Sequence, residues 1–208
     1  MTGSFITLEG PDGSGKSTII RLIGEYLKNQ QIDFIETREP GGTLIGEDIR
    51  DIILDNKNTK MSYEAEALLY AASRAQHVHE KISPALRDGK LVICDRFVLS
   101  SLAYQGVGRG LGIERVKAIN DFALNGVYPD LILFFHIDPQ VTLERKLGSK
   151  ETDRLENLGS SFHQKVYKGY MELLELYPKN IVMIDASRSI EEVLKQSIHA
   201  IEKILNKK

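Results

Sequence analysis

The chain reads Gly10-Pro11-Asp12-Gly13-Ser14-Gly15-Lys16-Ser17 directly after a short apolar run at residues 5–8. Apolar residues at helical spacing follow the loop, namely Ile19, Ile20, Ile23 and Leu27. A strand, a glycine-rich loop and a helix in this order are the context that the motif G-x-x-x-x-G-K-[ST] requires. Glycines let backbone N–H groups turn inward at the positive end of a helix, where they hold phosphate. We therefore predict a phosphate-binding loop made of Gly10, Pro11, Asp12, Gly13, Ser14, Gly15, Lys16, Ser17 and Thr18.

Two side chains of this loop carry distinct chemistry. Lys16 supplies a point charge to the β- and γ-phosphates of a nucleoside triphosphate, and the Ser17 hydroxyl is suited to ligate Mg²⁺. A P-loop alone is compatible with kinases, GTPase switches, ATPase motors and ATP-dependent ligases, so the class must come from other segments.

The rest of the chain alternates apolar runs with helical patterns. Strands are expected at residues 5–8, 32–36, 91–94, 131–135 and 181–184, and helices at 46–54, 63–87, 113–125, 141–147, 161–176 and 190–205. Continuous apolar strands separated by helices indicate a parallel sheet covered on both faces. We predict an α/β fold with a five-stranded parallel sheet, in a single domain over residues 1–208.

Composition limits the classes of function. The 208 residues are 42% hydrophobic and 27% charged with a formal net charge of −2, which disfavours disorder and the basic field of a protein that coats nucleic acid. Cys94 is the only cysteine, so neither an intrachain disulfide nor a cysteine zinc cluster can form. Without a leader-like N-terminus or a long apolar run, we expect a cytoplasmic protein with no membrane or nucleic-acid-polymer partner.

A second set of phosphate-reading residues follows the second and third strands. Pro40, Gly41 and Gly42 form a turn that holds Arg38 and Glu39 at the strand end. Carboxyl ends of parallel strands share one edge, which also carries the P-loop. The third strand ends in Asp95-Arg96, where an aspartate can hold Mg²⁺ or its water and an arginine can bind phosphate bidentately.

A base could be read by Tyr70 and Arg74, which are four residues apart on one helix face. The ring can stack on a planar base while the guanidinium bonds its edge. A GTPase switch is disfavoured, because the nearest string to N-K-x-D is Asn56-Lys57-Asn58-Thr59 and the third strand does not lead into D-x-x-G.

Taken together, these segments resemble the thymidylate kinase family of P-loop nucleoside monophosphate kinases. The matching stretches are 9–18, 38–43, 70–77, 95–97 and 100–106, and the similarity covers essentially the whole chain. The resemblance implies transfer of the γ-phosphoryl group of ATP to dTMP, with Mg²⁺, by a homodimer. The long helix at 63–87 is a candidate element of the dimer interface.

Site roles also follow from the resemblance. Arg38 and Arg96 would clamp the dTMP phosphate near Asp12, and Tyr104 would pack beneath the deoxyribose. The whole substrate set would be Asp12, Arg38, Tyr70, Arg74, Arg96, Ser100, Ser101, Tyr104 and Gln105, with Ser17 and Asp95 at the metal. The family usually has phenylalanine where this chain has Tyr70.

The polar segment 148–160 corresponds to the family's short lid over the ATP phosphates. Position 13 is glycine here, whereas some family members carry an arginine inside the P-loop. Positive charge must come from elsewhere, and Arg145 and Arg154 are the first choices because a planar guanidinium matches equatorial phosphate oxygens. The expected catalytic set is therefore Lys16, Asp12, Arg38, Arg96, Arg145 and Arg154.

Three other classes remain open from the sequence. A kinase for another nucleoside monophosphate or for a deoxynucleoside shares most of these loops. A GTP-binding switch would prefer guanine nucleotides and need no acceptor. A nucleotide-binding regulatory module would bind ATP without transferring phosphate.

Overall fold

A computed structural model describes residues 3–138, 141–142 and 153–206. Its five strands form one parallel sheet in the order β2-β3-β1-β4-β5. The strands are β1 Ser4–Glu9, β2 Phe34–Arg38, β3 Leu91–Asp95, β4 Leu131–His136 and β5 Ile181–Asp185. The predicted α/β fold with a five-stranded parallel sheet is confirmed.

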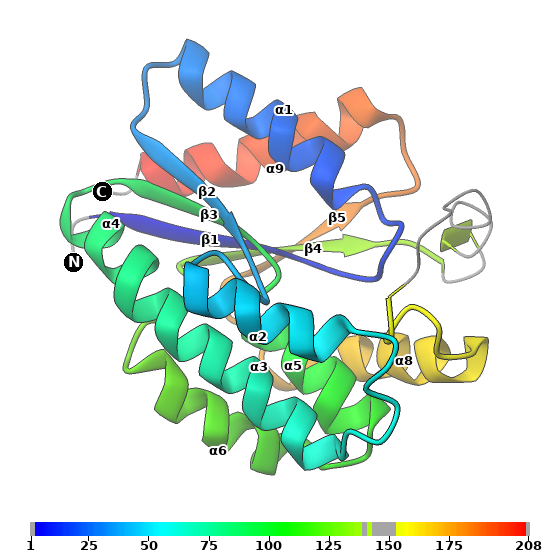
Figure 1. Ribbon diagram of the computed structural model, residues 1–208. Coiled ribbons are helices and arrows are strands. Elements are labelled where there is room, and N and C mark those ends of the chain that lie inside the picture. The colour runs from blue at the N-terminus through cyan, green and yellow to red at the C-terminus, as the bar shows by residue number, and fades with distance from the viewer. Residues whose placement is uncertain (1–2, 139–140, 143–152, 207–208) are drawn as a thin grey trace.

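Helices cover both faces of the sheet (Figure 1). One face carries α1 Lys16–Asn29 and α9 Ile190–Leu205. The other face carries α2 Leu44–Leu54, α3 Tyr63–His77, η1 Val78–Ile82, α4 Ser83–Arg87, α5 Val98–Ser101, η2 Leu102–Gly108, α6 Ile113–Leu124 and α8 Ser160–Leu176. None of the helices within the described part of the chain has the length and apolar character to cross a bilayer.

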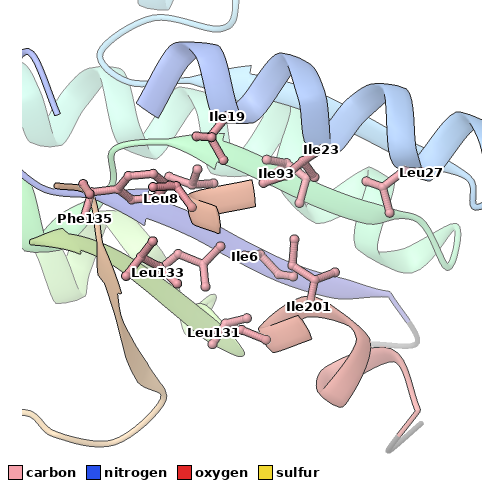
Figure 2. Close-up of a cluster of buried hydrophobic side chains, with 14 of the residues drawn as sticks. Ile6, Leu8, Ile19, Ile23, Leu27, Ile93, Leu131, Leu133, Phe135 and Ile201 are labelled. Atoms are coloured by element: carbon pink, nitrogen blue, oxygen red, sulfur yellow. The ribbon is translucent and has the colours of Figure 1, made fainter. Parts of the chain in front are cut away.

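The apolar side chains of β1 divide between the two layers. Ile6 and Leu8 join side chains of α1 and α9 in the cluster that Figure 2 shows. Phe5 points to the opposite face, where its ring meets Phe97 edge-on with centroids 4.9 Å apart. Successive side chains of β1 point to opposite faces of the sheet, and both faces are covered, so every β1 side chain is buried. This burial fixes the position of β1 and therefore of the loop that follows it.

Strand register brings the site residues to one edge. Asp95 is level with Leu8 of β1 on one side and with Arg38 of β2 on the other. Just beyond the strands, the Arg96 N–H donates to the Leu8 carbonyl over 2.9 Å. The P-loop and the ends of β2 and β3 therefore meet at the carboxyl edge, as the sequence predicts.

Two expected elements differ in detail, one helical segment was not expected, and one expected helix cannot be compared. The helix at 63–87 is interrupted by the π-helical turn η1, because Pro84 at the start of α4 lacks an N–H and its ring displaces the carbonyl four residues earlier. The strand expected at 32–36 runs two residues further along, since its pairing with β3 continues to Arg38. The sequence reading missed the helical segment 98–108, and the helix expected at 141–147 lies largely outside the described residues.

Close packing of α8 on η2 depends on Gly169. A Cβ at Gly169 would lie 2.8 Å from Cβ of Val107 in η2, which is a stiff, branched part of the side chain. We expect Gly169→Ala to lower the free energy of unfolding by about 1–2 kcal/mol, because overpacking outweighs the roughly 1 kcal/mol gain in helix propensity. Chemical denaturation measures this.

The matched control is Gly159→Ala at the start of α8. Gly159 has an ordinary φ of −58°, and a methyl group added there would meet no atom within 4 Å, so its substitution should change stability by less than about 0.5 kcal/mol. Equal effects of the two substitutions would refute the packing argument.

Candidate active site

The P-loop wraps around the Lys16 ammonium group. Gly10, Gly13 and Gly15 have φ values of 134°, 76° and 90°, which only glycine adopts freely. A Cβ at Gly10 would also lie 2.7 Å from the Phe135 carbonyl oxygen of the neighbouring strand. Lys16 Nζ donates to the carbonyl oxygens of Gly10 at 3.1 Å and Pro11 at 2.9 Å, and to Ser14 Oγ at 3.3 Å.

Burial sets the protonation of this lysine. Desolvation, with the positive charge of Arg96 as the next cause, lowers the pKa of Lys16 to about 8, against the opposing pull of Asp95 and Asp12. The ammonium group is thus held by weak carbonyl acceptors in a site where an anionic phosphate oxygen would be a stronger partner.

We expect Lys16→Ala to lower kcat by about 100-fold or more, because it removes a preorganised cation from the transferring phosphate. The matched control is Lys28→Ala, at an exposed position in the last turn of the same helix. Steady-state kinetics with a circular-dichroism check of folding decides the matter. A folded Lys16→Ala enzyme with wild-type kcat would contradict the P-loop assignment.

Arg96 forms the centre of the site beside the P-loop. Its guanidinium forms an ion pair with Asp12 and donates to Ser100 Oγ at 2.9 Å and Tyr170 Oη at 3.1 Å. Burial opposes its charge, but Asp12 and the neighbouring hydroxyls raise the pKa of Arg96 above its ordinary value. Tyr104 completes the group, because its hydroxyl donates to the second Asp12 oxygen over 3.0 Å.

The buried carboxylate of Glu9 holds the residues next to Arg96 in place. Glu9, at the end of β1, accepts the Phe97 N–H at 2.8 Å and the hydroxyl of Ser100, and burial raises its pKa. Sequence reasoning did not assign Glu9 or Tyr170 a role. An acidic residue at the end of a fully buried strand could have indicated a role for Glu9. Tyr170 lies 74 residues from Arg96, so no local pattern pointed to it.

Arg74 is held in place by an extensive polar network. Its side chain is 2% exposed and forms a 2.7 Å ion pair with Glu39, whose other oxygen contacts His77 at 3.0 Å. The guanidinium also donates to Ser101 Oγ at 3.0 Å and to the side chain of Asn120 on α6. These partners fix the guanidinium at the wall of a pocket of about 200 Å³.

The same pocket gathers all nine predicted substrate residues together with Asp95: Asp12, Arg38, Tyr70, Arg74, Asp95, Arg96, Ser100, Ser101, Tyr104 and Gln105. Tyr70 is half-buried, and burial raises the pKa of its hydroxyl.

Arg50 also lines this pocket and escaped the sequence reading. It donates to the Pro40 carbonyl at 3.0 Å, and both burial and the charge of Arg38 lower its pKa. Arg38 itself pairs with Glu47 at 2.8 Å and is about half exposed. Among the residues that the structure describes, four arginines line this pocket, namely Arg38, Arg50, Arg74 and Arg96.

A second pocket of about 360 Å³ lies over the P-loop, lined by Gly13, Gly15, Lys16, Ser17 and Thr18. The two pockets share Asp12, Asp95, Arg96 and Glu156. One pocket can hold triphosphate oxygens, the other an anionic planar ligand, and the boundary between them carries both cations and acids. The fold and this site define a P-loop phosphotransferase.

Comparison with known proteins places the chain more narrowly. The family model described as thymidylate kinase matches residues 8–198. The thymidylate kinase of Finegoldia magna is 59% identical over 199 residues, which are 96% of this chain and 98% of that protein. That of Clostridium novyi is 52% identical over 196 residues, covering 93% and 96% of the two chains, and that of Lactobacillus helveticus is 54% identical over 211, covering 99% and 98%. The chain belongs to the thymidylate kinase family.

The two arginines predicted for the lid have different outcomes. Arg145 lies outside the described residues. Arg154 does not face the P-loop, because its guanidinium donates to the Ile53 carbonyl at 2.8 Å and to Glu66 at 2.7 Å. Its backbone N–H also reaches the Leu54 carbonyl at the end of α2. In this arrangement Arg154 joins the segment before α8 to α2 and α3, and its role at the ATP phosphates stays a prediction.

Proposed function

We propose that this chain transfers the γ-phosphoryl group of ATP to the 5′-phosphate of dTMP, giving ADP and dTDP for dTTP synthesis. The observation that carries the proposal is the junction of the two pockets at Asp12 and Arg96. Two nucleotides whose phosphates meet at this junction would react in line, with positioning and charge neutralisation as the main contributions of the protein.

Each pocket has a role in this reaction. The P-loop and Lys16 would hold the ATP phosphates, while Arg38 and Arg96 would hold the dTMP phosphate. Arg50, from the wall of the same pocket, adds a third cation for that phosphate. A general base is unnecessary, because the second ionisation of a phosphate monoester has a pKa of about 6 and the attacking oxygen is already anionic.

The opposite end of the acceptor pocket suits a pyrimidine. Tyr70 offers a ring for stacking, and Arg74 offers N–H donors to a base carbonyl. Tyr104, held by Asp12, would lie beneath the deoxyribose, and Ser101 and Gln105 would complete the polar contacts. This division of the pocket supports a nucleoside monophosphate as the acceptor.

Mg²⁺ fits the residues at the junction. Asp95 Oδ1 is buried and has no hydrogen-bond partner among the described residues, so it is an oxygen ligand in need of a cation or a water. Ser17 lines the adjoining P-loop pocket, and phosphate oxygens would supply further ligands. When bound, Mg²⁺ would neutralise charge on the ATP phosphates.

Assembly and location belong to the same proposal. Large apolar side chains are exposed on α2, α3 and α6, namely Ile45, Ile52, Leu68 and Phe122. Two copies of the chain that pair through these helices would cover this surface, which supports a homodimer. We place the enzyme in the cytoplasm, where ATP and deoxynucleotides are made.

The decisive experiment is ATP-dependent phosphorylation of dTMP, dUMP, UMP, dCMP, AMP and GMP, followed by coupled detection of ADP. We expect the highest kcat/KM with dTMP, because its base edge and its missing 2′-hydroxyl match the pocket. Omission of Mg²⁺ should abolish turnover. Failure on dTMP with efficient turnover of another monophosphate would reassign the base pocket.

A further inference from the structure

Glu66 on α3 is a buried carboxylate that the reaction chemistry does not use. It is 0% exposed and accepts hydrogen bonds from three side chains, two at η2 and its C-terminal end and one in the segment before α8. Oε1 accepts Gln105 Nε2 at 3.0 Å and Arg109 Nε at 3.1 Å. Oε2 accepts Arg109 Nη2 at 2.8 Å and Arg154 Nη2 at 2.7 Å. Each carboxylate oxygen thus has two donors.

The charge on Glu66 determines how Gln105 is oriented. Burial alone would raise the pKa of Glu66, but the hydrogen bonds from Arg109, Gln105 and Arg154 outweigh it and lower the pKa. An ionised carboxylate only accepts hydrogen bonds, so the amide of Gln105 must turn its NH₂ group towards Glu66. The Gln105 carbonyl oxygen, which accepts no hydrogen bond from the described residues, is then left for the pocket that Gln105 lines.

This carbonyl complements the one donor on the edge of a thymine. The edge of thymine carries two carbonyl acceptors and one donor, the N3–H. Arg74 only donates, and Ser101 Oγ already accepts from Arg74. Gln105 Oε1, beside Arg74 in the pocket lining and without a donor among the described residues, is the acceptor that we assign to N3–H, and only while its amide keeps this orientation.

We infer that Glu66 is a positioning residue that locks the Gln105 amide and thereby selects pyrimidines with an N3–H over cytosine-type bases, whose N3 is an acceptor. The inference rests on the proposed function, since it concerns the base end of the dTMP pocket. A site that hydrogen-bonds one edge pattern rejects the other strongly, because a mismatched base leaves buried polar groups unpaired.

The guanidinium partners keep Glu66 both ionised and immobile. Arg109 lies between two rings, with its Cζ 4.8 Å from the Tyr63 centroid and 4.9 Å from that of Phe162. Arg154 is anchored separately at the Ile53 carbonyl. One carboxylate therefore faces two fixed cations, and it cannot rotate towards solvent without leaving both unpaired.

The test compares dTMP with 5-methyl-dCMP, which keeps the 5-methyl group and reverses the hydrogen-bond pattern at N3 and C4. In Glu66→Gln the new amide can donate or accept, so Gln105 is free to flip. We expect kcat/KM for dTMP to fall about tenfold, mainly through KM, with little loss for 5-methyl-dCMP. Calorimetric dissociation constants replace kcat/KM where turnover is too slow.

Arg109→Met is the matched control, because it removes two hydrogen bonds to Glu66 but leaves the carboxylate paired with Arg154 and facing Gln105. It should lower stability while the ratio of the two substrates stays within about twofold of the wild-type value. A ratio that falls as far in Arg109→Met as in Glu66→Gln would overturn the inference, since general loosening of the site would then explain both.

Two further variants keep the test decisive if Glu66→Gln does not fold and show whether its effect acts through Gln105. If Glu66→Gln does not fold, Glu66→Asp keeps the charge but withdraws the carboxylate from Gln105, and the substrate ratio should fall in the same direction. In a Gln105→Ala background, Glu66→Gln should no longer change the ratio. An unchanged ratio in a folded Glu66 variant, or an undiminished effect in the Gln105→Ala background, overturns the inference.

The wild-type measurement separates the two proposals. A wild-type enzyme that does not phosphorylate dTMP overturns the proposed function and this inference with it. A wild-type enzyme that prefers dTMP, combined with an unchanged ratio in the Glu66 variants, overturns the inference alone.

Discussion

The ion pair between Glu39 and Arg74 joins the sheet edge to the helical layer. Both side chains are 2% exposed, and a buried charge that loses its partner destabilises a protein by roughly 3–5 kcal/mol, so neither can move alone. Glu39 follows β2 directly, while Arg74 lies on α3 and reaches Ser101 of α5 and Asn120 of α6. His77 binds the second Glu39 oxygen and Thr37 Oγ1. This network sets the distance between the strand edge and the helices that wall the acceptor pocket.

The same face of α3 therefore serves both packing and recognition. Glu66, Tyr70 and Arg74 are spaced by four residues, so they lie along one side of the helix. Glu66 and Arg74 are buried in hydrogen-bonded ion pairs, and Tyr70 between them lines the pocket. A helix that packed on apolar side chains alone could not present polar groups to a base at this position. Buried ionic contacts instead hold it rigidly while its polar groups remain in the site.

Local patterns predicted the parts of the site that follow strand ends. The P-loop, Arg38 and Asp95-Arg96 were accessible because each is adjacent in sequence to an apolar strand, and parallel strands end at one edge. Contacts between distant segments were not accessible: Tyr170 reaches Arg96 across 74 residues, and Gln105 reaches Glu66 across 39. Arg154 could not be placed from the sequence either. Its guanidinium is chemically suited to bind phosphate, but its position beside Ile53 and Glu66 depends on how α2 and α3 pack.

A chain with a net charge of −2 can bind two polyanions if its site cations exchange their protein acceptors for phosphate oxygens. Three cations that line the two pockets already have acceptors: Lys16 has loop carbonyls, Arg96 has Asp12 and Arg38 has Glu47. Phosphate oxygens are stronger acceptors than carbonyls, and they can replace the half-exposed Glu47 at low cost. Arg96 differs, because Ser100 and Tyr170 hold its other nitrogen independently of Asp12. Its guanidinium can therefore change its anionic partner without changing its place, which is the preorganisation that charge stabilisation in phosphoryl transfer requires.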